Sequence, residues 1–114
     1  MRAALAQPPD GVTIAWEGAF FARHSLALVN RELASSVMEE RPSWTIAPVW
    51  HHSDDGALRA DPSWRDLART IAEPPPHADI WIRHGWPPDF ARPSCRSFVL
   101  VQPWEYGALP VAWL

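Results

Sequence analysis

The sequence has few of the features that define several large classes of protein. It contains one cysteine, Cys95, so no disulfide can form within the chain and nothing requires an oxidising compartment. No apolar run approaches the roughly 20 residues of a membrane span. The first residues, MRAALAQPPDG, carry one arginine and reach two prolines before any apolar core, so they make a poor signal peptide. These absences predict a soluble, cytoplasmic protein.

Positive charge, glycine and paired metal ligands are also scarce. Ten Lys and Arg stand against 13 Asp and Glu, and the formal net charge of −3 disfavours nucleic acid as a partner. The five glycines nowhere form the GxGxxG spacing of a dinucleotide-binding loop. The cluster His51, His52, Asp54 and Asp55 lies on a polar segment, where adjacent side chains point apart. We therefore expect a solvated loop there and no metal site.

Tryptophan and proline, by contrast, are abundant. A chain of 114 residues that is 47% hydrophobic suffices for one domain with a core. Its 13 prolines are clustered, at residues 8–9, 74–76 and 87–88 among others, and such clusters stiffen loops. Eight residues are tryptophan. We interpret the prolines as rigid connections within an ordered domain.

Four short apolar runs predict β-strands at residues 11–16, 44–49, 78–83 and 97–101. A tryptophan stands at or just beyond the downstream end of each run, at positions 16, 50, 86 and 104. Pro48, inside the second run, indicates a bulge or an edge strand. If the strands are parallel, all four indoles reach the same edge of one sheet.

Two segments have the pattern of helices. Over residues 26–40 the apolar residues recur at three- and four-residue spacing, which predicts an amphipathic helix with Ser25 as its N-cap. Its inward residues would be Leu26, Val29, Leu33 and Val37, with Asn30 and Arg31 elsewhere. A second helix is predicted over residues 62–72, after a loop at 51–60. Asp61 would cap it, and Trp64, Leu67, Ala68 and Ile71 would face inward.

The resulting β-α-β-α-β-β order predicts an α/β fold. We expect a single Rossmann-like domain with a four-stranded, mostly parallel sheet and flanking helices. The connection between the last two strands leaves room for at most one helical turn, near residues 88–91. Pro110 predicts the start of a last helix, which residue 114 truncates.

Function is expected at the carboxyl ends of the strands, where open parallel sheets bind ligands. The segments RHGWPPDF (83–90) and QPWEYG (102–107) each place ionisable and aromatic residues on a proline-stiffened tip. His84 would act as a general base, and Glu105 would orient it or bind hydroxyl groups. Alternatively, Trp86 and Trp104 pack under the next helix while the charged residues of both tips form salt bridges.

Two further sites follow the first predicted strand. In WEG (16–18), Glu17 or the backbone near Gly18 would contact a ligand, or else Gly18 serves only a turn. His24 and Ser25 stand at the start of a helix, whose free N–H groups can hold an anion or a hydroxyl group. A capping serine beside an exposed histidine is an equally good interpretation.

Three segments together resemble a known family. WEGAFFARHSLALVNREL, WIRHGWPPDF and FVLVQPWEYGALPVAWL are similar to the amino-terminal domain of bacterial glycosyltransferases of the two-Rossmann-domain (GT-B) type, in the large retaining group that uses nucleotide sugars. The resemblance covers nearly the whole chain. Residues 43–77 have no counterpart in it.

The resemblance implies that residues 1–114 are an acceptor-side domain. The donor-binding domain, and the paired glutamates expected in that domain, would be absent. Catalysis would occur between the two domains, without an obligatory metal. This chain would bind no cofactor, and the nucleotide-sugar donor would bind to the missing domain. The partners would be a sugar acceptor or glycan and a donor-binding domain or separate chain. The chain alone would then be inactive. The acceptor-binding residues would be Gly18, His24, Ser25, Trp86, Asp89 and Trp104, and the catalytic residues His84 and Glu105.

Two other functions fit the same residues. One hypothesis is a non-catalytic carbohydrate-binding or regulatory module that keeps the fold. The other is a flavodoxin-like interaction domain whose tryptophans belong to the core. The latter predicts a loss of several kcal/mol for Trp104→Ala, as for deletion of a buried aromatic ring.

Overall fold

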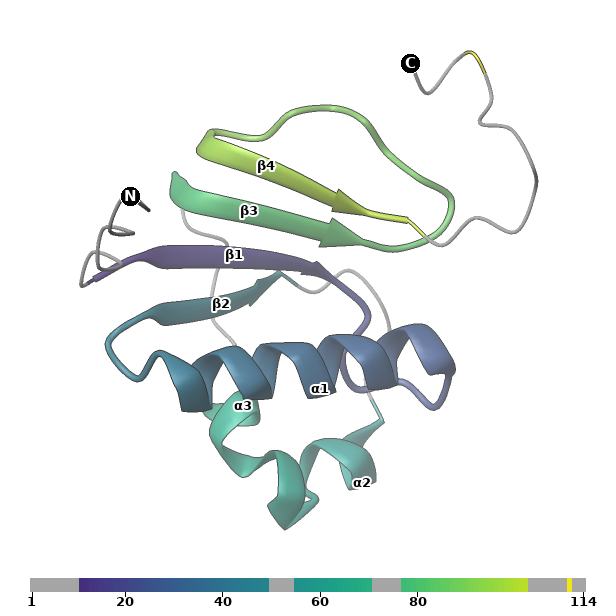
Figure 1. Ribbon diagram of the computed structural model, residues 1–114. Coiled ribbons are helices and arrows are strands. Elements are labelled where there is room, and N and C mark those ends of the chain that lie inside the picture. The colour runs from purple at the N-terminus through teal and green to yellow at the C-terminus, as the bar shows by residue number, and fades with distance from the viewer. Residues whose placement is uncertain (1–10, 50–54, 71–76, 103–110, 112–114) are drawn as a thin grey trace, which may run out of the picture.

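The computed structural model describes residues 11–49, 55–70, 77–102 and 111. Its four strands are β1 (Thr13–Gly18), β2 (Thr45–Val49), β3 (Ala78–His84) and β4 (Cys95–Val101). They form one sheet in the order β2-β1-β3-β4, and every neighbouring pair is parallel. The described helices lie on one side of this sheet (Figure 1). The prediction of a single Rossmann-like α/β domain is confirmed, with a sheet that is parallel throughout.

The central strand β1 is buried on both faces, as its nearly continuous apolar sequence predicts. Ile14, Ala15 and Trp16 are each at most 3% exposed. The strand continues two residues beyond its predicted end, so Trp16 lies inside β1 and packs in the core beneath the helices. The edge position predicted from Pro48 is confirmed, because β2 is the first strand of the sheet.

Helix α1 (Ser25–Glu40) follows the predicted range, but the predicted cap is wrong. Ser25 is the first helical residue, and the N-cap is His24, whose backbone is extended. The Nδ1 atom of His24 accepts a hydrogen bond from the backbone N–H of Ala27 at 3.3 Å. An imidazole nitrogen therefore satisfies the free helical N–H that a serine hydroxyl was expected to satisfy.

The buried face of α1 also differs from the prediction. Asn30 and Arg31 are buried, together with Ala27 and Ala34, whereas Val29 is 41% and Leu33 45% exposed. Arg31 donates to the carbonyl oxygens of Phe20 and Ala22, and its guanidinium lies 5.2 Å from the Trp64 ring centroid. Relative to the predicted orientation, the helix is rotated so that its polar residues face the protein interior. This orientation is stable because Asn30 and Arg31 have buried hydrogen-bond partners and the two alanines allow close packing.

The region between β2 and β3 contains more helix than predicted at its start. Residues 55–60 were expected in a loop, yet α2 (Gly56–Arg59) forms there, with the Asp55 carboxylate accepting from the Leu58 N–H at 3.1 Å. Asp55 also pairs with Arg23 at 2.6 Å, which lowers the pKa of its carboxyl group. This pairing ties α2 to the loop before α1. His51, His52 and Asp54 lie outside the described residues.

The helix predicted at residues 62–72 begins as expected and is divided in two. Asp61 accepts from the Ser63 N–H at 2.9 Å, and Pro62 is the first residue of the 3₁₀ turn η1 (Pro62–Trp64). Helix α3 (Arg65–Arg69) follows. Leu67 is buried, and Trp64 and Ala68 pack beside it in the core, as predicted. Ile71 lies outside the described residues.

The connection between β3 and β4 contains no helical turn, within the predicted limit of at most one near residues 88–91. Two of its carbonyl groups accept hydrogen bonds from a side chain instead. Arg83 donates to the backbone oxygens of Asp89 at 2.7 Å and Ala91 at 2.6 Å. The prolines of this segment lack the N–H groups that a helix needs, so an arginine takes the place of helical hydrogen bonds.

Among the residues that the structure describes, no helix has both the length and the apolar character that crossing a bilayer requires.

Candidate functional site

A small hollow at the carboxyl edge of the sheet brings together three residues predicted for the site. It has a volume of about 130 Å³ and is lined by Ala19, His24, Leu26, His84, Gly85 and Trp86. His24 comes from the start of α1, His84 from the end of β3, and Trp86 from the connection that follows. The expected edge of the sheet therefore does carry a concave surface with ionisable and aromatic side chains.

Asn30 fixes the chemical state of His84. The Trp16 indole N–H can only donate, and it contacts Asn30 Oδ1 at 3.1 Å, while Asn30 Nδ2 donates to the Ala19 carbonyl at 2.8 Å. The amide orientation is therefore determined, and the atom 2.8 Å from His84 Nδ1 is the acceptor Oδ1. His84 must carry a proton on Nδ1, so Nε2 of the neutral ring is left as a hydrogen-bond acceptor and a base.

His24 has the opposite polarity. Its Nδ1 accepts from the Ala27 N–H, so the neutral ring carries its proton on Nε2. His24 and His84 both line the hollow, and their rings keep one acceptor nitrogen, on His84, and one donor nitrogen, on His24. A hydroxyl group both donates and accepts, so it suits either nitrogen.

Gly18 allows the chain segments next to His84 to approach each other closely. It is paired with His84 across β1 and β3. A Cβ atom at Gly18 would collide with the backbone oxygen of His84 and would lie 2.8 Å from Asn30 Nδ2. The glycine is therefore required for the close approach of β1, β3 and α1. It affects the position of His84 because the two residues are in contact through their backbones.

Trp86 forms the rim of the hollow and is 61% exposed, so its ring is available to a ligand. The connection that carries it is held by Arg83, whose Nε lies 2.7 Å from Glu17 Oε2. The Trp81 indole N–H also donates to Glu17, at 3.1 Å. Glu17 is thus engaged by two neighbouring strand residues, as a support for the connection.

Three predicted site residues, Gly18, Ser25 and Asp89, do not line the hollow, and two others lie outside the described residues. Ser25 is exposed and does not line it. The Asp89 carboxylate accepts from the Ala91 N–H at 2.9 Å and lies 3.9 Å from Arg83, so it shapes the connection. This agrees with the alternative interpretation of a salt bridge at that tip. Trp104 and Glu105 belong to the segment that is not described.

Asn30 is the residue that the sequence did not reveal. Two small residues of α1 do indicate that Asn30 is buried. Ala27 and Ala34 are seven residues apart, on the face of the helix that contacts the sheet. Small residues at helical spacing mark the side where a helix can approach another element closely. A polar residue between them on that side would need a buried partner.

Burial makes the stability of the protein depend on His84 protonation. Desolvation lowers the pKa of His84 below its ordinary value of 6.5. Below pH 6.5, His84 is protonated in most unfolded molecules, whereas in the folded protein it stays neutral to a lower pH. The contribution of neutral His84 to stability is therefore complete above pH 6.5 and is lost as the pH falls through the depressed folded pKa. Urea unfolding at about pH 7.5 and about pH 5.5 should show this loss, and His84→Gln should reduce it. An identical pH dependence in both proteins would contradict this assignment.

Within residues 11–49, 55–70 and 77–102, no three His, Cys, Asp or Glu side chains gather as a metal site would require. Comparison of the chain with protein-family models, with curated proteins and with solved structures finds no match.

Proposed function

We propose that this chain is the acceptor-side half of a glycosyltransferase that moves a sugar from a nucleotide-sugar donor to an acceptor hydroxyl group. The observation that carries the proposal is the pair of histidines that line the hollow at the carboxyl edge, with an acceptor nitrogen on the His84 ring and a donor nitrogen on the His24 ring. The similarity of the three sequence segments to the amino-terminal domain of GT-B glycosyltransferases supports the same function.

In this proposal the acceptor hydroxyl donates to His84 Nε2 and accepts from His24 Nε2. As the hydroxyl oxygen bonds to the anomeric carbon of the donor sugar, the bond from that carbon to the phosphate oxygen of the nucleotide breaks and the nucleotide leaves. His84 takes the hydroxyl proton, which the neutral state of the buried ring permits. The exposed Trp86 ring stacks on the apolar face of the acceptor sugar. Trp104 and Glu105 would complete the acceptor side. The nucleotide sugar would bind to a separate donor-binding domain or chain.

Acceptor binding can be measured without the donor. Titration of the protein with a panel of mono- and oligosaccharides, followed by ligand-observed NMR, should identify a glycan that binds. For that glycan, His84→Gln and Trp86→Ala should each weaken binding by about tenfold or more, because each removes a direct contact. His77→Gln is a matched control, since His77 is exposed and contacts Ser94 instead. Absence of binding to every saccharide, or equal binding by all four proteins, would refute the proposal.

A non-catalytic carbohydrate-binding module is the second candidate. It is favoured by the small volume of the hollow, about 130 Å³, which accepts one polar group of a sugar and leaves the rest to the exposed Trp86. Transfer assays distinguish the two functions. With a donor-binding domain and its nucleotide sugar added, a glycosyltransferase half should form product from the bound glycan, whereas a binding module should not.

A further inference from the structure

A second hollow formed by described residues lies at the opposite end of the sheet from the site proposed above. It has a volume of about 420 Å³ and is formed where the strands begin, by residues next to the amino ends of β1 and β2 and by the first residues of β3 and β4. None of the described residues that were predicted for the site lines it. Its size is in the range of small-molecule sites.

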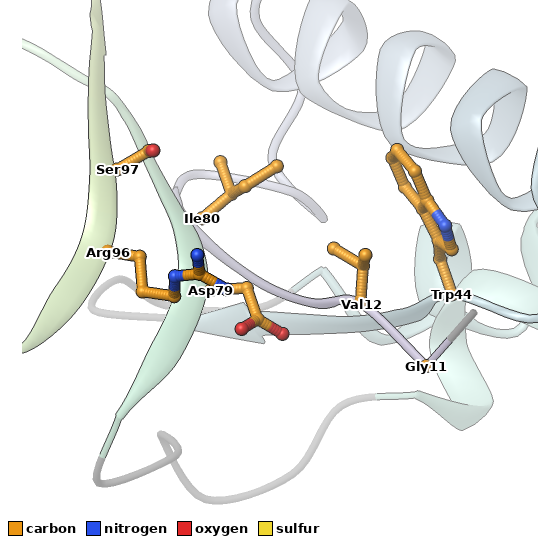
Figure 2. A pocket seen from close by; sticks show the side chains of 7 residues that line it. All are labelled: Gly11, Val12, Trp44, Asp79, Ile80, Arg96 and Ser97. Atoms are coloured by element: carbon orange, nitrogen blue, oxygen red, sulfur yellow. The ribbon is translucent and has the colours of Figure 1, made fainter. Parts of the chain in front are cut away.

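Two opposite charges face each other at this hollow. Asp79 and Arg96 are neighbours across β3 and β4, one residue after the pair Ala78 and Cys95, and Figure 2 shows the Arg96 guanidinium reaching across toward Asp79. Nevertheless they form no ion pair, and no described residue pairs with the Arg96 side chain. Asp79 is held toward β1 instead, because its Oδ2 accepts from the Thr13 N–H at 2.9 Å. The Oδ1 atom of Asp79 can still accept hydrogen bonds, and the Arg96 guanidinium can still donate them.

Apart from Gly11 and Ser97, the other residues that line the hollow are apolar. Figure 2 shows Val12, Ile80 and Trp44 projecting to the same side of the sheet, toward the helices. Ile80 and Trp44 are only partly buried, so both have surface left to cover. Asp79 and Ile80 are consecutive strand residues, so their side chains point to opposite faces of the sheet. A ligand that uses both faces would reach around the amino ends of the strands, with an apolar group on the three apolar residues and a polar head between Asp79 and Arg96.

We propose that this hollow binds an α-amino acid with a large apolar side chain. The ammonium group would donate to Asp79 Oδ1, and the carboxylate would accept from the Arg96 guanidinium. The side chain would cover Val12, Ile80 and the Trp44 indole. A simple carboxylate would meet the negative charge of Asp79 and a simple amine the positive charge of Arg96, whereas a zwitterion satisfies both.

Isothermal titration of the purified chain tests this pairing. L-Phenylalanine and L-leucine should bind, while N-acetyl-L-phenylalanine, L-phenylalaninamide and 3-phenylpropionate, which each lack one charge, should bind at least about tenfold more weakly. L-Alanine should also bind more weakly, because it lacks the apolar group. If neither large amino acid binds, or if a ligand with one charge binds as well as L-phenylalanine, the proposal is overturned.

Substitutions then locate the site. Arg96→Gln and Asp79→Asn should each weaken L-phenylalanine binding by about tenfold or more. The Asn side chain can still accept from the Thr13 N–H, and circular dichroism checks that both variants keep the fold. Arg69→Gln and Asp66→Asn remove an exposed pair in α3 and should leave the affinity unchanged. Unchanged affinity in Arg96→Gln and Asp79→Asn would place the amino acid elsewhere and overturn the proposal. This outcome is independent of glycan binding at the carboxyl edge.

Discussion

Replacing Asn30 with alanine should lower the free energy of unfolding by roughly 3–5 kcal/mol. Asn30 is fully buried, and its amide accepts from the Trp16 indole, contacts His84 Nδ1 and donates to the Ala19 carbonyl. Alanine would leave these three polar groups buried without their partner, and each such group costs about 1–3 kcal/mol. Equilibrium unfolding in urea measures the loss.

The same variant should change the chemistry of His84. Without the Asn30 oxygen, nothing described in the structure holds the proton on Nδ1, so the NMR signature of that tautomer should weaken. Glu39→Ala, at an exposed position of the same helix, is the control and should stay within about 0.5 kcal/mol of the wild type. If Asn30→Ala costs less than about 1 kcal/mol, the amide does not hold these elements together.

The fold could be predicted from local patterns, because strands and helices leave periodic traces in a sequence. The four apolar runs became the four strands, and Pro48 identified an edge. The rotation of α1 could not be predicted in this way. Periodicity counts Val29 and Leu33 as inward residues, but the rotation depends on partners contributed by distant segments, such as the Phe20 carbonyl and the His84 ring.

The site was predictable in part for a related reason. The carboxyl ends of parallel strands meet at one edge by geometry, so His84, Trp86 and His24 could be expected near each other. Which of the neighbouring charges would serve a ligand was not predictable. Glu17 and Arg83 lie on different strands and become each other's partners only when β1 and β3 align.

Replacing Arg83 with methionine should destabilise the protein by about 3 kcal/mol or more, as expected for removal of one partner from a buried ion pair. The Arg83 and Glu17 side chains are only 10% and 15% exposed, so the remaining carboxylate would be largely buried without its cation. The Asp89 and Ala91 carbonyls would lose their donor as well. Methionine retains much of the apolar contact with Phe98, whose ring centroid lies 4.9 Å from the guanidinium. Urea unfolding measures the effect.

A double-mutant cycle with Glu17→Gln separates the ion pair from the support of the connection. The double variant should be destabilised by less than the sum of the two single variants, because no charge is left without its partner. Chymotrypsin gives a second measurement: cleavage after Phe90, on the connection that Arg83 holds, should be faster in Arg83→Met than in Glu17→Gln, which keeps the two carbonyl contacts. Additive energies together with equal cleavage rates would mean that Arg83 neither pairs with Glu17 nor positions the segment that carries Trp86. Contacts other than those of Arg83 would then position the exposed Trp86 indole at the rim of the hollow.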